Sequence, residues 1–137
     1  PTATSTENLV RALNMVKDQP ISGVKDKYYV WSETLRQEMI AAIGDAAHEL
    51  ATRALREGNT RNARMAAAIG RKVDPVNEVY WRDGMRAEHL AGDAAGVERL
   101  VTQLATALTQ IDPDYAEPEP ETESLIEQLR ARRALAS

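Results

Sequence analysis

The chain has 137 residues, a net charge of −4, no cysteine, and an aromatic content of 4% with no phenylalanine. This length is typical of one domain with a core built from helix-favouring aliphatic residues and alanine. The lack of cysteine excludes disulfides, thiolate metal sites and a cysteine nucleophile. Scattered basic residues argue against direct nucleic-acid binding, and no apolar run is long enough to span a membrane.

The first predicted element is a helix from about Thr6 to Lys17, which Ser5 can cap. A turn and a loop with aromatic residues follow, over residues 19–31. A long helix is then predicted from Ser32 or Glu33 to about Arg56, because apolar residues recur along one stripe.

Gly58 is expected to stop this long helix in a left-handed conformation. The next helix is predicted from about Thr60 to Arg71, and its inner side carries small residues that let it lie close to its neighbour. Asp74-Pro75 reads as an N-cap followed by proline at the first helical position. This predicts a further helix from Pro75 to about Ala91, interpreted as the first helix of a second pair.

Gly92-Asp93 is the second predicted turn, and the helix that follows it, from Ala94 to about Ile111, has the most regular apolar pattern in the chain. Residues 112–120 form a proline-rich acidic connector. A last helix is predicted from Glu121 or Thr122, in the role of an end cap. No segment has a convincing strand period, so the predicted class is all-α.

Two glycine turns, Gly58 and Gly92, lie 34 residues apart, which is the period of the tetratricopeptide (TPR) repeat. With Gly58 in register, the small residues Ala51 and Ala63 and the proline Pro75 fall on the repeat positions for close packing and for the next helix. We therefore predict a single domain of TPR-like antiparallel helix pairs, about six helices in a short right-handed array. An unrelated helical bundle with coincident turns is the alternative.

The order of these motifs resembles the bacterial transcriptional activator domain (BTAD), the TPR-like domain of SARP-type regulators and of larger actinobacterial multidomain proteins. The resemblance covers nearly the whole chain. It is carried by residues 12–21, Tyr28, Tyr29, Trp31, residues 50–59, Ala63-Arg64, Asp74-Pro75, Glu78, Tyr80, Arg82, residues 85–87, Gly92-Asp93 and residues 118–125.

This resemblance implies an all-helical interaction and regulatory module, often placed after a winged helix-turn-helix domain. That DNA-binding domain has no counterpart in this chain, so neither DNA binding nor transcriptional activation transfers to any residue here. We expect a piece of a longer protein, with this domain in the cytoplasm and the full-length protein free to carry a membrane anchor.

The candidate partner-binding groove consists of Arg53, Trp81, Arg82 and Arg86, because arginine and tryptophan are common binding anchors and arginines can clamp an acidic peptide. The alternatives are that Trp81 fills the core and that the arginines form a solvated surface. His48 and His89 are predicted to be structural. We expect no catalytic, metal or cofactor-binding residue, and therefore no enzyme.

The leading hypothesis is a non-catalytic module that binds a protein or a neighbouring domain of the same chain within a bacterial regulatory protein. The alternative is a structural module for self-association, in which an end helix packs against its copy in a homodimer.

Overall fold

The computed structural model describes residues 5–17, 33–114 and 117–136, which form six helices and no strand. The all-α prediction is confirmed. The turn and loop predicted over residues 19–31 lie outside the described residues. The helices are α1 (Thr6–Lys17), α3 (Glu33–Glu57), α4 (Thr60–Val73), α5 (Glu78–Leu90), α6 (Ala94–Ile111) and α7 (Pro120–Ala136).

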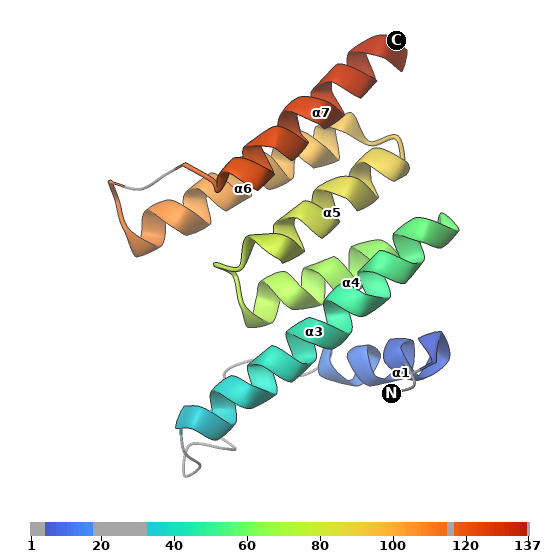
Figure 1. The fold of residues 1–137 in the computed structure, drawn as a ribbon, viewed down its shortest axis with the longest axis vertical. Coiled ribbons are helices and arrows are strands. Elements are labelled where there is room, and N and C mark those ends of the chain that lie inside the picture. Colours follow the sequence, from blue (N-terminus) through green and yellow to red (C-terminus); the bar gives the residue numbers. More distant parts are fainter. Residues whose placement is uncertain (1–4, 18–32, 115–116, 137) are drawn as a thin grey trace.

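Successive helices from α3 to α6 pack against one another as antiparallel neighbours (Figure 1). Helix α5 also contacts α3 on one side and α7 on the other, so α3, α5 and α7 line one side of the array. Helices α4 and α6 lie behind them, and α1 packs on α3 and α4 (Figure 1). The result is an array of helix pairs with one further helix at each end.

The two predicted glycine turns have the same geometry. Gly58 and Gly92 have φ of +74° and +76°, the left-handed region that glycine enters without a Cβ clash. After each glycine, the next amide bonds back to a carbonyl of the preceding helix, Asn59 N to Ala54 O at 2.8 Å and Asp93 N to Glu88 O at 2.9 Å. The side chains of those two residues then cap α4 and α6. Each turn therefore ends one helix and starts the next within two residues.

The buried side chains of the core are smaller at the α1 end of the array than at the α7 end. Leucine and alanine side chains of α1, α3 and α4 form one cluster, and larger residues of α5, α6 and α7 form another. Between them, Ala54, Ala63 and Ala87 are almost fully buried, as the close approach of the first helix pair requires. The repeat positions Ala51 and Ala63 are both fully buried, as small-residue packing positions should be.

The start of α5 was predicted wrongly. Pro75 lies in a turn, not at the first position of α5, and Asp74 ends α4 by donating its amide to Gly70 O. Asn77 caps α5 instead, because its side chain accepts the amide hydrogen of Val79. The repeat-position proline is thus displaced from the helix, and its carbonyl accepts a hydrogen bond from Trp81 Nε1 at 2.8 Å.

Helix α7 closes the array. Its buried side chains, Thr122, Leu125, Ile126 and Leu129, follow helical spacing and lie against α5 and α6. Its opposite side is exposed and largely polar, as the predicted end cap requires. The helix begins at Pro120, one residue before the predicted start. None of the described helices combines the length and apolar character that a membrane crossing requires.

Candidate functional site

The surface of α5 that lies between α3 and α7 carries two of the four predicted groove residues, Arg82 and Arg86. Arg82 and Arg86 are one helical turn apart on it and line a groove of about 380 Å³. The other wall of the groove is the first half of α7, from Pro120 to Gln128. Charged groups from α5 and α7 therefore meet in this one place.

Two of the four predicted groove residues lie elsewhere. Trp81 is only 6% exposed, belongs to the core cluster of α5, α6 and α7, and holds Arg71 over its ring at 5.4 Å. It fills the core, so its assignment as a binding anchor was wrong. Arg53 reaches α1, where its Nη1 donates to Thr6 Oγ1 at 3.3 Å. Arg82 reaches α7 at the other end of the array, so the arginines do not form a single clamp.

Arg82 already holds acidic residues of its own chain. Its guanidinium donates to Thr122 Oγ1 at 2.9 Å and forms ion pairs with Glu119 at 3.3 Å and Glu121 at 3.4 Å. Glu78, one turn earlier on α5, accepts the amide hydrogen of Glu119 at 2.9 Å. These contacts attach the end of the acidic connector and the first turn of α7 to α5.

Asp83 and His48 form a pair that the sequence reasoning did not identify. Asp83 is 2% exposed, and the ring nitrogen Nδ1 of the half-exposed His48 donates to its carboxylate at 2.7 Å. His48 lies 34 residues before Arg82, so the repeat register already placed it beside Arg82 and Asp83. This 34-residue spacing could have predicted the pair, but the sequence interpretation compared His48 only with its neighbours in the chain.

Burial changes the protonation equilibrium of the carboxyl group of Asp83. Burial raises the pKa of Asp83 above its ordinary value of 3.8, although the hydrogen bond from His48 and the charges of Arg86 and Arg82 oppose the rise. The ionised carboxylate is therefore poorly solvated at neutral pH, and His48 supplies its closest polar contact. This arrangement joins α3 to α5 across the middle of the face.

Asp83→Asn is expected to change the pH dependence of stability. A raised pKa in the folded state means that the folded protein binds the proton more tightly, so the contribution of Asp83 falls as pH rises from 3.8 through its folded pKa. As pH rises across this interval, the free energy of unfolding of the variant should therefore increase relative to that of the unmodified protein. Urea titrations at several pH values measure the difference.

Glu98→Gln is the matched control, with the opposite expected sign. The hydrogen bond from Arg130 lowers the pKa of Glu98, so Glu98 stabilises the fold above its ordinary value of 4.5 and loses this contribution as pH falls. As pH rises through this range, the free energy of unfolding of the Gln variant should decrease relative to that of the unmodified protein. The same trend for both variants would contradict the assigned environment of Asp83.

Arg86 is the arginine on this face that is most available to a partner. It is roughly half exposed, and within the described part of the chain its only ion pair is a 3.8 Å contact with Asp83. Other charged pairs join helices closely, such as Arg64 with Glu88 and Arg130 with Glu98, both at hydrogen-bonding distance through two nitrogens.

The polar side chains of this face contact one another across the helices. Across residues 5–17, 33–114 and 117–136, no group of three or more histidine, aspartate or glutamate side chains is placed to hold a metal ion. The buried carboxylate of Asp83 and the ring of His48 engage one another across α3 and α5. Comparison of the chain with family models, curated proteins and solved structures found no match.

Proposed function

We propose that this domain is a non-catalytic interaction module that binds an acidic segment of a partner protein, or of a neighbouring domain, on the face of α5. The observation that carries the proposal is Arg86, a half-exposed arginine with one long ion pair, at the edge of a groove of about 380 Å³. A carboxylate can approach this guanidinium from the groove and form a charge-assisted hydrogen bond.

The arrangement of the other charges supports this choice of residue. Arg82 is held by three groups of the connector and α7, and Asp83 is covered by His48. A partner would have to displace internal contacts to reach either of them. Arg86 can accept a partner while the helix packing stays as it is.

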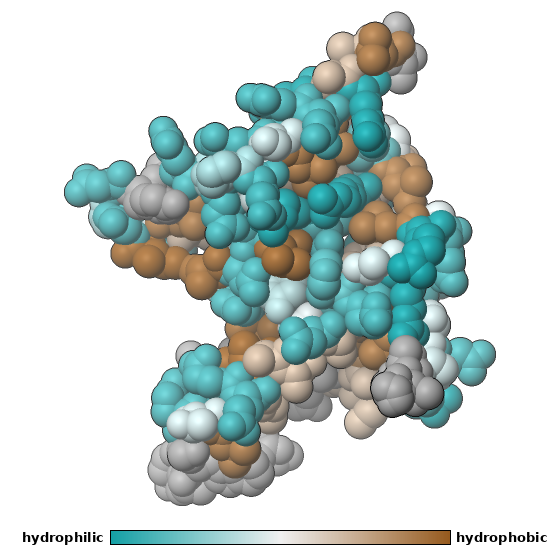
Figure 2. Space-filling view, viewed as in Figure 1, coloured by the Kyte–Doolittle hydropathy of each residue, from teal (hydrophilic) through white to brown (hydrophobic). Residues whose placement is uncertain are grey.

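We also propose a TPR-like and BTAD-like role in a bacterial, cytoplasmic regulatory protein. The two equivalent glycine turns 34 residues apart and the polar end helix support a short scaffold of this kind. Figure 2 supports a largely polar contact surface, because hydrophilic residues cover most of the visible side over α5 and α7, with apolar patches between them.

Photo-crosslinking in host cells tests the proposal, with the crosslinker placed at position 86 or, as control, at the exposed Gln103 of α6. We expect one protein or domain to be crosslinked from position 86 and not from position 103. The purified partner is then titrated against Arg86→Gln and Arg99→Gln. Arg99 is the matched control, because it is also exposed and has one ion pair of 3.9 Å, with Asp93.

Loss of the Arg86 contact should weaken binding about tenfold, or ~1.4 kcal/mol, whereas Arg99→Gln should leave the affinity unchanged. If the two variants bind with equal affinity, and circular dichroism shows both to be fully helical, the proposal that Arg86 and the α5 face bind the partner is wrong.

A further inference from the structure

Charge is divided between the two ends of the helix array. At one end, α4 and α6 finish and α5 and α7 begin (Figure 1). This acidic end carries Asp74, Asp112, Asp114, Glu119 and Glu121. At the other end, α4 and α6 begin, and the second half of α7 lies beside the first turns of α6. This basic end carries Arg61, Arg64, Arg99, Arg130, Arg132 and Arg133, which outnumber its acidic residues Glu57, Glu88, Asp93 and Glu98.

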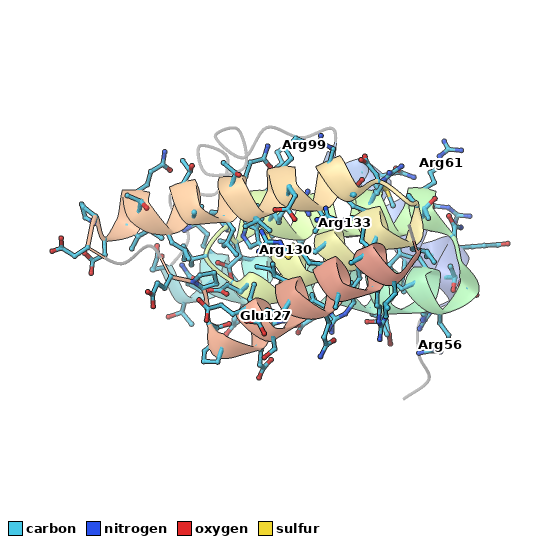
Figure 3. The ribbon with its side chains drawn as sticks, turned by 90° about the horizontal axis from the view of Figure 1, so that it is seen from above. Arg56, Arg61, Arg99, Glu127, Arg130 and Arg133 are labelled. Carbon is cyan, nitrogen blue, oxygen red and sulfur yellow. The ribbon has the colours of Figure 1, made fainter. Side chains whose placement is uncertain are left out.

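The basic end contains a pocket of about 350 Å³ between α6 and α7. Ala94, Val97 and Leu129 give it an apolar floor, and three arginines of α7 stand at its rim with one opposing acid, Glu98. Three positive charges against one negative leave a local charge of +2 in a chain of net charge −4. Figure 3 shows Arg130 and Arg133 on the side of α7 toward α6.

The arginines of the rim are not equally engaged. Arg130 binds Glu98 through two nitrogens, at 2.9 and 2.6 Å, and Arg133 lies 3.8 Å from the same carboxylate. Arg132 lines the pocket with no ion pair to any described residue. An occupant that offers an aliphatic side chain to the floor and carboxylates to the rim would match both parts of the pocket.

The acidic end of the same molecule has this chemistry. Ile111, the last residue of α6, is 63% exposed, whereas four earlier aliphatic side chains of this helix, Val97, Leu100, Leu104 and Leu108, are buried. Asp112 and Asp114 lie one and three residues after it, on either side of Pro113, and both are exposed. The side chain of Asp112 accepts the amide hydrogen of Asp114 at 3.0 Å, which fixes the turn that presents them.

We propose that the protein associates head to tail, with Ile111, Asp112 and Asp114 of one copy seated in the α6–α7 pocket of the next. The pocket lies at the first turns of α6 and Ile111 at its last, about 25 Å away along the helix, so one molecule cannot fill its own pocket. Such a contact joins two different surfaces, so it extends into chains or closes into rings.

This association differs from the predicted packing of an end helix against its copy, since the exposed side of α7 is largely polar. It is also separate from the proposed partner site, because no residue of the α5–α7 groove belongs to the segment 111–114 or to the lining of the α6–α7 pocket. Ion pairs at a small exposed interface make it weak and sensitive to salt.

Sedimentation velocity from about 10 to about 500 µM protein tests the proposal, in about 0.05 M and about 1 M salt. We expect the average mass to rise with concentration at low salt and to return to that of the monomer at high salt. Ile111→Ser should weaken association at least tenfold, whereas Leu135→Ser, at an 87% exposed leucine of α7, should have no effect.

Two charge-reversed proteins test whether the two ends touch each other. D112K/D114K carries positive charge on both contact surfaces, the segment 111–114 and the pocket, and R132E/R133E carries negative charge on both. Each alone should remain monomeric, and an equimolar mixture should associate, because each end then meets an opposite charge. R56E/R61E is the control, since Arg56 and Arg61 lie away from the α6–α7 pocket (Figure 3).

Three outcomes would overturn the proposal, provided that circular dichroism shows every variant folded. They are a monomer at all concentrations in low salt, association that persists in the reversed variants, and a mixture that stays monomeric. None of these results bears on crosslinking from position 86, so the two proposals can fail separately.

Discussion

Removal of α7 by deletion of residues 120–137 is expected to unfold the domain. The deletion uncovers the side of the core cluster that contains Trp81, Met85 and Leu104, and it removes three buried aliphatic side chains that pack on them. Burial of one such side chain contributes about 1.5–3 kcal/mol, so the loss is of the same order as the whole free energy of unfolding of a typical domain. Circular dichroism at 25 °C should show loss of helix throughout the remaining chain.

A pair of identical substitutions within α7 separates burial from helix formation. Leu129→Ala removes a side chain that is 4% exposed and should lower the free energy of unfolding by about 2–5 kcal/mol. Leu135→Ala, at an 87% exposed position of the same helix, should stay within about 0.5 kcal/mol of the unmodified protein. A deleted protein that melts at an unchanged temperature would show that α7 is an appendage.

The helices could be predicted because their signals are local. Gly58 and Gly92 define two turns by backbone conformation alone, and Asp93 caps the helix that follows the second turn. Apolar spacing placed α6 at its observed bounds, Ala94 to Ile111. These features depend on residues within one or two turns of each other, so one sequence contains all the information they need.

The candidate site was harder to predict because it depends on which groups, far apart in the sequence, come into contact in the fold. Trp81 looked like a binding anchor, but its indole hydrogen finds the carbonyl of Pro75, and the ring is then buried. Arg82 looked free to bind an acidic peptide, but the acidic connector of the same chain reaches it. Neither outcome follows from helical spacing, since both depend on the loop path between elements.

Gly44 is another residue whose role depends on a contact with a different helix. Glycine weakens a helix interior, and Gly44 lies in the middle of the predicted long helix. Helix α3 is continuous from Glu33 to Glu57, and Gly44 is buried where the hydroxyl of Tyr80 reaches it. The glycine provides space for a side chain of another helix, which only the packed structure reveals.

The charged residues divide into those that hold helices together and those that remain available. Arg64 joins α4 to α5, and Arg130 joins α7 to α6, each through a two-nitrogen contact with a glutamate. Arg86 and Arg132 have at most one long ion pair within the described residues. Both proposed interactions use arginines of this second group, so neither requires the fold to open.

Gly70→Ala is expected to lower the free energy of unfolding by about 2 kcal/mol, even though alanine favours a helix. An added Cβ at this position would lie 2.5 Å from two ring atoms of Tyr80 and 3.0 Å from its Cβ. These atoms lie next to the backbone, in a side chain that is 5% exposed. Rotation of the side chain therefore cannot relieve the overlap unless α5 also moves. The strain should therefore exceed the gain of about 1 kcal/mol in helix propensity.

Gly44→Ala meets the other end of the same side chain and provides the control. Its Cβ would overlap the Tyr80 hydroxyl oxygen, and the ring carbon that carries this oxygen would lie 2.9 Å away. Tyr80→Phe removes that oxygen, so it should restore part of the stability lost in Gly44→Ala and little of that lost in Gly70→Ala. Urea unfolding of the two double variants measures both coupling energies, and equal rescue at the two glycines would contradict the packing of Tyr80 between α3 and α4.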